Sequence, residues 1–225
     1  MTARVLPFVS PPDFGAITAP WWKDRTVYLI GGGPSLSGFA LKRLCGLGHC
    51  IGINHSMFAI PVAAGISIDQ QLIKKRHQEL AEFAQTTQLY LAPGDHFCKT
   101  VIPVAGAIYL HSEFVPGLST SCDLLHTGGT SGYAALNLAV LKRARKIVLL
   151  GYDYGVIDGR HHYHDDHFWH EPGHQNWSDW AKRFDVVSTQ CSELGIKIVN
   201  ASRRSAIECF PKMSIEDALQ WGTPD

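Results

Sequence analysis

The sequence predicts an α/β protein in which helices cover both faces of a mostly parallel β-sheet. Short apolar runs of strand length alternate with longer helical segments, and some runs, such as 147–150, are apolar at every position. Strands of that kind are typical of a parallel sheet that is buried on both faces. In addition, two glycine-rich loops open predicted helices. At 225 residues the chain suits one large Rossmann-like domain with one active site.

The composition argues against several classes of function. Lysine plus arginine equals aspartate plus glutamate at 20 each, so we expect no general nucleic-acid binding. No segment approaches the roughly 18 consecutive apolar residues that cross a bilayer, so we expect no membrane partner. The N-terminus lacks the apolar stretch of a secretory signal, which predicts a cytoplasmic protein.

Residues 1–25 are predicted to form an extended N-terminal arm, and 26–225 the main domain. The arm is rich in proline and aromatic residues and shows neither helical nor strand periodicity. Its apolar side chains must lie on the body of the protein or on a second subunit. A homo-oligomer formed through the arm is therefore one expectation.

The first predicted strand, at 26–31, runs into the loop Gly31-Gly32-Gly33-Pro34-Ser35. Glycines let a backbone approach a ligand closely, and Pro34 and Ser35 suit the start of a helix, whose free N–H groups attract anions. A nucleotide phosphate is the first ligand that this loop suggests. The loop is neither G-x-G-x-x-G nor a P-loop, and a tight turn without a ligand remains an alternative. A short helix is expected at 37–44.

Two further strands deliver polar side chains to the edge where open α/β sheets bind their ligands. The strand at 50–53 ends at Asn54 and His55, and the strand at 63–68 ends at Asp69. The pattern then predicts a surface helix at 71–86, strands at 89–92 and 107–110, and irregular chain over 112–127.

A second glycine-rich loop, at 127–132, opens a helix of small and apolar residues that continues to 141. This composition predicts close packing on the sheet. The strand that follows, at 146–150, ends in Gly151-Tyr152-Asp153. Beyond it the pattern predicts a helix at 179–194, a strand at 196–200 and a terminal helix at 214–221.

Residues 159–174 hold six of the 12 histidines. The string His162-x-His164-x-Asp166-His167 matches a metal-binding motif of metallo-β-lactamase-like hydrolases, but those enzymes take further histidine ligands later in the chain, and none follows His174. A single-metal site remains open, because imidazole and carboxylate are ordinary zinc ligands. The alternative is a lid over the strand ends that presents a histidine as general base. The aromatic residues of the loop that contains this stretch, which could stack on a base or a sugar, are Tyr163, Phe168, Trp169 and Trp177.

Taken together, these features resemble the superfamily of small bacterial sialyltransferases, flagellin nonulosonic-acid transferases and archaeal 6-hydroxymethylpterin diphosphokinase-like proteins. The likeness covers most of residues 26–200. It rests on the strand before Gly31-Gly32-Gly33, the strand end at Asn54, the Gly129-Thr130-Ser131-Gly132 helix start and the strand that ends at Asp153. It is greatest to uncharacterised phage-encoded members, which carry a similar histidine-rich loop; such an origin would place the protein in a host cytoplasm.

The resemblance implies a donor site and a base. In the sialyltransferases, which need no metal, the first glycine loop and the asparagine hold a CMP donor, and the Thr/Ser-Gly helix start contacts the nucleotide. A later histidine is the base, which here would be His162, His164 or His167. Together with Asp69 at its strand end, the nucleotide-binding residues would be Gly32, Gly33, Ser35, Asn54, Thr130, Ser131, Gly132 and Asp153.

Three functions follow from these expectations. The first is a sialyltransferase-like glycosyltransferase that uses a nucleotide-activated sugar of the CMP-sugar type as donor. The second is an ATP:pterin-type diphosphokinase, in which Asp69 or Asp153 would help to hold Mg²⁺. The third is a phage accessory protein that binds a nucleotide without turnover.

Overall fold

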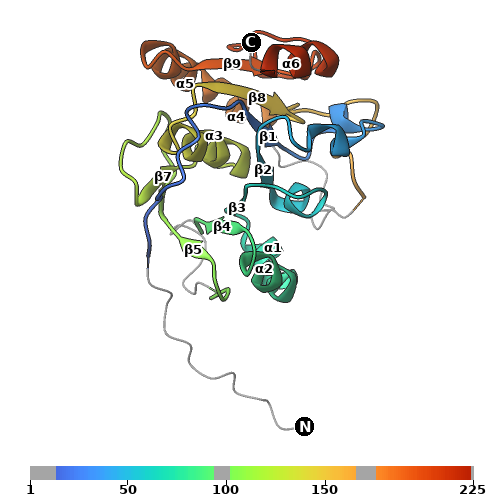
Figure 1. The fold of residues 1–225 in the computed structure, drawn as a ribbon. Helices are drawn as coiled ribbons and strands as arrows, with labels where there is room; N and C mark the ends of the chain where they lie inside the picture. The colour runs from blue at the N-terminus through green and yellow to red at the C-terminus, as the bar shows by residue number, and fades with distance from the viewer. Residues whose placement is uncertain (1–13, 94–101, 166–175, 224–225) are drawn as a thin grey trace.

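A seven-stranded sheet runs through the centre of the computed structural model, which describes residues 14–93, 102–165 and 176–223 (Figure 1). Each neighbouring pair of its strands is parallel, so the predicted α/β class with a mostly parallel sheet is confirmed. The strand order is β5-β4-β3-β2-β1-β8-β9. The strands are β1 (Val27–Ile30), β2 (His49–Ile53), β3 (Ala64–Ser67), β4 (Gln88–Leu91), β5 (Ile108–Tyr109), β8 (Lys146–Leu150) and β9 (Lys197–Asn200).

The first strand lies inside the sheet, between β2 and β8. Val27 pairs with His49 on one side and with Ile147 on the other. From β1 the chain moves outward to β5, and later returns to the opposite side of β1 with β8. The strand order therefore reverses between β1 and β8, and open α/β sheets bind ligands at the C-terminal edge near such a reversal.

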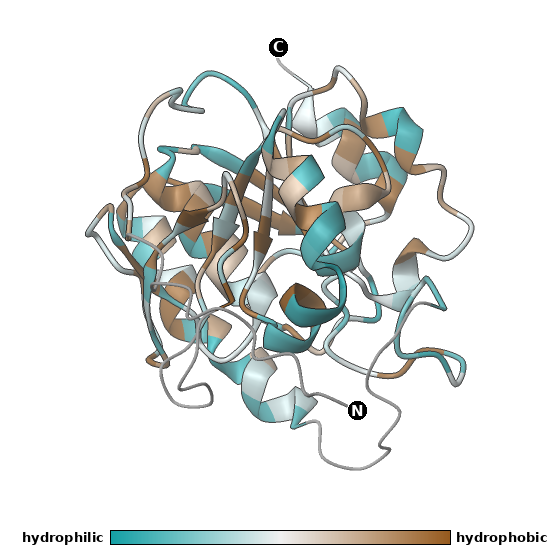
Figure 2. Ribbon diagram, turned by 90° about the horizontal axis from the view of Figure 1, so that it is seen from below, coloured by the Kyte–Doolittle hydropathy of each residue, from teal (hydrophilic) through white to brown (hydrophobic). Residues whose placement is uncertain are grey.

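Both faces of the sheet are covered, which explains why the strands are apolar at every position. Val27 and Leu29 lie in one core with helices α3 and α5, and Tyr28 and Ile30 lie in another with α6. Figure 2 shows the hydrophobic strands between helices whose outer surfaces are hydrophilic. The helices are α1 (Gln70–Lys75), α2 (His77–Ala84), α3 (Ser131–Leu141), α4 (Trp177–Lys182), α5 (Phe184–Glu193) and α6 (Ile215–Gly222).

The prediction of a helix at 37–44 is wrong. In its place lie two short 3₁₀ turns, η1 (Pro34–Leu36) and η2 (Leu41–Leu44). Gly38 between them has a φ of +77°, and Gly46 after them a φ of +85°, which leaves too few residues in helical conformation for an α-helix. Leu36 and Leu44 still anchor the turns, because both side chains are buried against the sheet.

Two other segments differ from expectation in detail. The helix predicted at 71–86 is divided into α1 and α2 at Arg76, whose φ of −112° and ψ of 27° are not helical. The guanidinium of Arg76 pairs with Glu79 and lies over the Phe58 ring. The stretch predicted as irregular contains a second, two-stranded parallel sheet, formed by β6 (His111–Glu113) and β7 (Leu124–His126).

The described part of the N-terminal arm lies on its own domain. Ile17 and Trp22 are each 2% exposed in the main core. Backbone N–H groups of the arm donate to the carbonyls of Tyr109, Cys122 and Lys142. The rest of the arm, residues 1–13, lies outside the described residues. Among the residues that are described, no helix combines the length and the apolar character needed to cross a membrane.

Candidate functional site

A pocket of about 570 Å³ opens at the C-terminal edge of the sheet. Residues from the ends of β1, β2, β3 and β8 contribute to its lining, together with the start of α3 and the histidine-rich loop. Of the residues singled out from the sequence, those in the lining are Gly32, Gly33, Asn54, Asp69, Thr130, Ser131, Gly132, His162 and His164. Ser35 and Asp153 are not part of the lining, and His167 lies outside the described residues.

The first glycine loop forms the wall of the pocket between β1 and β8. The N–H of Gly31 donates to the Leu150 carbonyl at 2.8 Å, and the N–H of Gly33 to the Gly151 carbonyl at 2.9 Å. A Cβ atom on Gly31 or Gly33 would lie 2.6 Å from the Gly151 carbonyl oxygen. Glycine is therefore required here by close approach to the neighbouring strand end.

Asp153 lies beneath this loop. Its side chain is 1% exposed, and its Oδ2 accepts a 2.8 Å hydrogen bond from the N–H of Ser35. The other carboxylate oxygen accepts a hydrogen bond from the hydroxyl of Ser202, which follows β9. Ser35 and Asp153, which the resemblance places at the nucleotide, are thus hydrogen-bonded to each other. The anion at the start of η1 is a carboxylate of the chain.

The start of α3 faces the pocket with its hydroxyl groups. Thr130 caps the helix, since its Oγ1 accepts a 3.2 Å hydrogen bond from the N–H of Tyr133. The Thr130 hydroxyl is also hydrogen-bonded to the hydroxyl of Tyr154 at 2.7 Å. Burial raises the pKa of the Tyr154 phenol, which keeps it protonated. Tyr154 therefore fixes the position of the capping hydroxyl.

The loop before α3 is held from both sides. Gly128 and Gly129 have φ values of +48° and +85°, which a side chain would strain. Arg183 donates to the Gly128 carbonyl at 2.6 Å and lies over the ring of Phe114, against which Gly129 packs.

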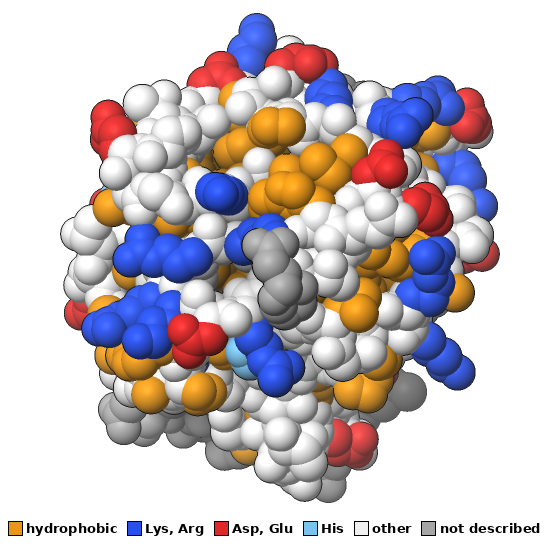
Figure 3. Space-filling model, turned by 45° about the horizontal axis from the view of Figure 1, so that its top comes forward, with side chains coloured by type: hydrophobic (Ala, Val, Ile, Leu, Met, Phe, Trp, Pro, Cys, Tyr) orange, Lys and Arg blue, Asp and Glu red, His pale blue; other side chains and the backbone are white. Residues whose placement is uncertain are grey.

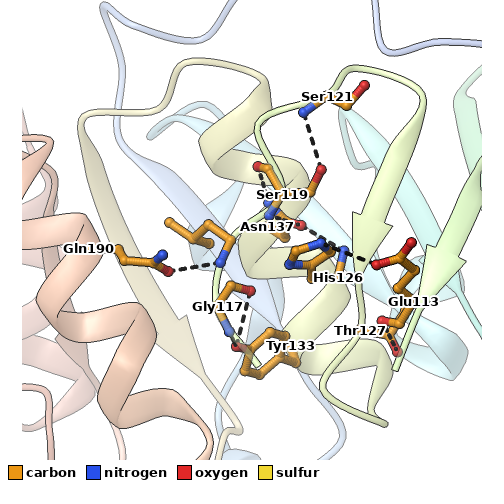
Figure 4. A network of polar contacts seen from close by, with 10 residues as sticks. Glu113, Gly117, Ser119, Ser121, His126, Thr127, Tyr133, Asn137 and Gln190 are labelled. Carbon is orange, nitrogen blue, oxygen red and sulfur yellow. Dashed lines mark hydrogen bonds and ion pairs between the residues drawn. The ribbon is translucent and has the colours of Figure 1, made fainter. Parts of the chain in front are cut away.

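A polar network joins α3 to the segment that precedes it in the chain (Figure 4). The buried Asn137 side chain accepts hydrogen bonds from the N–H groups of Ser119 and His126, and donates one to the Ser119 carbonyl. The Tyr133 hydroxyl accepts from the N–H of Gly117 and donates to its carbonyl. These bonds tie the segment before α3 to the helix itself.

Asn54 and Asp69 lie on the opposite side of the pocket. Asn54 directly follows β2 with a φ of +53°, and its Oδ1 accepts a 2.8 Å hydrogen bond from the Ser67 hydroxyl. Oδ1 of Asp69 caps α1, since it accepts hydrogen bonds from the N–H groups of Gln71 and Leu72. Residues in left-handed backbone conformation other than glycine are concentrated at functional sites, and both Asn54 and Tyr154, with a φ of +49°, lie in the lining.

Three histidines meet over the glycine loop. The rings of His162 and His164 are stacked at 5.4 Å, and the His55 ring lies 4.7 Å from that of His164. A Cβ atom on Gly32 would lie 3.1 Å from Nδ1 of His162 and 3.6 Å from Nε2 of His164.

The residue between these two histidines anchors the loop. Tyr163 donates its N–H to the Gly32 carbonyl at 3.0 Å, and its hydroxyl is hydrogen-bonded to Ser56 at 3.1 Å. Ser56 in turn donates to the Gly31 carbonyl at 2.7 Å. The segments that follow β1, β2 and β8 are therefore held together above the strand ends.

The metal alternative receives no support from the described residues, which contain no group of three or more His, Cys, Asp or Glu placed to hold a metal ion. Asp166 and His167, which complete the metal-binding string, lie outside the described residues.

Aromatic rings form the far wall of the pocket. Trp177 lies edge-on to Tyr154 at 6.3 Å and to Trp180 at 5.6 Å, and the His161 ring lies 6.5 Å from it. Trp177 was expected from the sequence to offer stacking, whereas Tyr154 and Trp180 were not singled out. His55 was placed at the correct strand end but was not assigned to the site. An aromatic residue shortly after a strand that ends at the pocket edge is the signal that could have identified Tyr154.

Comparisons with known proteins bear on the fold. No protein-family profile matches the chain, and no curated protein matches its sequence. Among solved structures, the chain is similar to the MAf glycosyltransferase from Magnetospirillum magneticum AMB-1, with a TM-score of 0.56 and 15% sequence identity. The match covers 89% of this chain and 36% of the other, so this chain spans about a third of the length of that protein. The likeness shows that the two proteins share a fold.

Proposed function

We propose that this protein is a nucleotide-dependent transferase that passes a sugar from a nucleotide-activated donor to a hydroxyl acceptor. The observation that carries the proposal is a single pocket in which the hydroxyl-rich start of α3 faces a cluster of histidines. The start of α3 supplies hydrogen-bond donors for a leaving phosphate, and the histidines supply a proton acceptor. The fold shared with the MAf glycosyltransferase supports the same class of reaction.

The phosphate of the donor would lie at the start of α3. This helix has 11 residues, and Ser131 and Gly132 in its first turn line the pocket. Unpaired N–H groups and the helix dipole favour an anion there. The first glycine loop is less suited to that role, because the N–H groups of Gly33 and Ser35 already donate to Gly151 and Asp153.

The charge of the lining favours a donor with a single phosphate. The lining residues, all in the described part of the chain, include no Lys or Arg and one carboxylate, that of Asp69. A CMP-sugar carries one phosphodiester charge at its leaving group, whereas a nucleoside diphosphate would bring more negative charge without a cation to balance it.

The same geometry argues against a diphosphokinase. That reaction needs carboxylates to hold Mg²⁺ beside the phosphates. Both oxygens of Asp153 accept hydrogen bonds from the chain, and Asp153 is not in the lining. The carboxylate of Asp69 caps α1. The metal-independent transfer is therefore the better-supported function.

In the transfer that we propose, His162 or His164 accepts the proton of the acceptor hydroxyl. The acceptor oxygen forms a bond to the anomeric carbon, and the bond from that carbon to the phosphate oxygen breaks. The electron pair of the broken bond stays on the phosphate, where donors at the start of α3 stabilise it. Neither step requires a covalent intermediate with the enzyme.

The direct test is incubation with CMP-sugars and UDP-sugars, with EDTA or with Mg²⁺, followed by chromatography of the released nucleotide. We expect slow release of CMP that EDTA does not abolish. Absence of both binding and hydrolysis with every sugar donor would overturn the proposal. Turnover of ATP that depends strictly on Mg²⁺ would instead identify a diphosphokinase, and saturable nucleotide binding without any product would identify a binding protein.

A further inference from the structure

Cations gather at the edge of the sheet where the strands begin, opposite the pocket. Arg25 precedes β1, Lys146 begins β8 and Lys197 begins β9, and these three strands are neighbours. Lys146 and Lys197 are direct partners in the strand register. Adjacent strands lie about 4.8 Å apart, so the starts of these three strands lie side by side at this edge. We call this surface the basic edge; its residues are Lys23, Arg25, Arg143, Arg145, Lys146 and Lys197.

The basic edge differs from the rest of the described surface in how its charges are balanced. None of its six residues has an Asp or Glu partner within the described part of the chain. Figure 3 shows Lys and Arg side chains on both halves of the face turned toward the viewer. Elsewhere the ion pairs include Arg43 with Glu216, Arg76 with Glu79, Arg160 with Asp165, Arg203 with Asp217, Arg204 with Asp158 and Lys212 with Glu208.

The positive field of this edge extends to a neighbouring histidine. His49 begins β2, next to β1 in the sheet. Its pKa is lowered from the ordinary value, first by burial and then by repulsion from Arg25 and Lys142. Arg25 and Lys142 therefore act together on His49 at this edge.

Partly exposed apolar side chains lie among the cations. The guanidinium of Arg143 lies 4.4 Å from the ring centre of Trp21, and the ammonium of Lys146 lies 4.6 Å from that of Trp221. Leu194, whose carbonyl accepts a hydrogen bond from Arg145, is 49% exposed. Indole rings beside cations are typical of surfaces that meet a membrane interface.

We propose that the basic edge is a peripheral docking surface for an anionic lipid bilayer. Clusters of four to eight Lys and Arg residues are the usual size for binding such a surface. The expectation of no membrane partner rests on the lack of an apolar segment long enough to cross a bilayer, and a peripheral surface needs no such segment. The pocket opens at the opposite edge, so a docked molecule would present it to the solvent. This proposal does not depend on the proposed function.

The test is sedimentation of the full chain with two kinds of vesicle, one of phosphatidylcholine alone and one of phosphatidylcholine mixed with phosphatidylglycerol. We expect binding to the mixed vesicles only, and its loss at high salt. In a triple variant, Arg25→Gln, Arg143→Gln and Lys197→Gln, each lost cation should weaken binding about fivefold, on the order of a hundredfold together. The matched control, which removes the same charge from exposed positions elsewhere, is Lys74→Gln, Lys75→Gln and Lys182→Gln.

Three outcomes would overturn the proposal. The first is equal binding of the wild type to both kinds of vesicle, or binding to neither. The second is binding that the triple variant retains although its melting temperature shows that it is folded. The third concerns labelled single-stranded or duplex DNA. If the wild type bound DNA but not vesicles, and the triple variant lost the DNA binding, the basic edge would be assigned to nucleic acid.

Discussion

The carboxylate of Asp153 accepts a hydrogen bond of 2.8 Å from the backbone N–H of Ser35. These residues are separated by 118 positions in the chain, and their contact joins the loop after β1 to the loop after β8. A second bond, from the hydroxyl of Ser202, adds the end of β9. The buried carboxylate thus joins three neighbouring strand ends.

Replacement of Asp153 should destabilise the fold. Asp153→Ala leaves the Ser35 N–H and the Ser202 hydroxyl without their acceptor, and we expect the free energy of unfolding to fall by about 2–4 kcal/mol. Asp153→Asn keeps one acceptor oxygen and should lose less. Urea unfolding followed by circular dichroism measures both changes.

The control for this experiment is Asp165→Ala. Asp165 is fully exposed and pairs with Arg160 on the surface, so its loss should leave the unfolding midpoint unchanged. If Asp153→Ala were as stable as Asp165→Ala, the bond network under the glycine loop would not be the stabilising element that we describe.

Gly32→Ala should separate activity from stability. The new methyl group would meet Nδ1 of His162 at 3.1 Å and Nε2 of His164 at 3.6 Å, both at the ends of side chains that can shift. We expect the melting temperature to change little and the rate of CMP release to fall at least tenfold, because the histidines leave their positions above the loop.

Gly155→Ala is the matched control, since its backbone is not in the left-handed region and the nearest atom to the added methyl is the Asp153 carbonyl oxygen at 3.8 Å. This variant should keep both its stability and its rate. A Gly32→Ala protein with unchanged turnover would show that the histidine positions above Gly32 are not needed for the reaction.

The sequence predicts the sheet well because its strands are short, apolar at every position and followed by glycine or polar residues. The same signal placed Asn54, Asp69 and the start of α3 at one edge, and all of them line the pocket. The reason is that in a parallel sheet all C-terminal strand ends share an edge.

Partners far apart in the chain could not be predicted in this way. The contact of Asp153 with Ser35 depends on how two loops meet, and the local pattern before Ser35 is equally that of a phosphate site. The helix expected at 37–44 failed because the positive φ of Gly38 is a tertiary outcome. The basic edge was hidden by a net charge of zero, since counting charges does not show where they gather.

The histidines over the glycine loop can be distinguished by substitution. His162→Gln and His164→Gln each remove a proton acceptor while keeping a polar side chain, and loss of the general base should lower the transfer rate by about 10²–10⁴-fold. We expect one of the two to show this loss with donor binding unchanged, as measured by calorimetry with a CMP-sugar. The other should show a smaller loss, because it positions its neighbour through the 5.4 Å ring stack.

If both histidine variants retained the wild-type rate, the histidine cluster would not supply the base. His111→Gln serves as the control, because His111 stacks on Phe14 at the other end of the sheet. Its rate should equal that of the wild type.

Lys142 should make stability depend on pH in an unusual direction. Its side chain is fully buried, and its ammonium donates to the Thr18 carbonyl at 2.6 Å and to the Gln88 amide at 3.0 Å. Burial lowers the pKa from the ordinary 10.5 to about 8. Between these values the unfolded chain holds a proton that the folded protein has released. The contribution of Lys142 to the free energy of unfolding therefore rises as the pH is raised through this window.

Lys142→Met removes this contribution. The free energy of unfolding of the wild type minus that of the variant is therefore compared at two pH values. We expect the difference in unfolding free energy to increase by about 2 kcal/mol between pH ~7 and pH ~9.5, as measured by urea unfolding. The control is Lys182→Met, which removes a lysine from an exposed position. A difference for Lys142→Met that stays constant or falls over the same range would mean that the buried amine keeps its proton. In that case the contacts with Thr18 and Gln88 would stabilise the charged form against its burial.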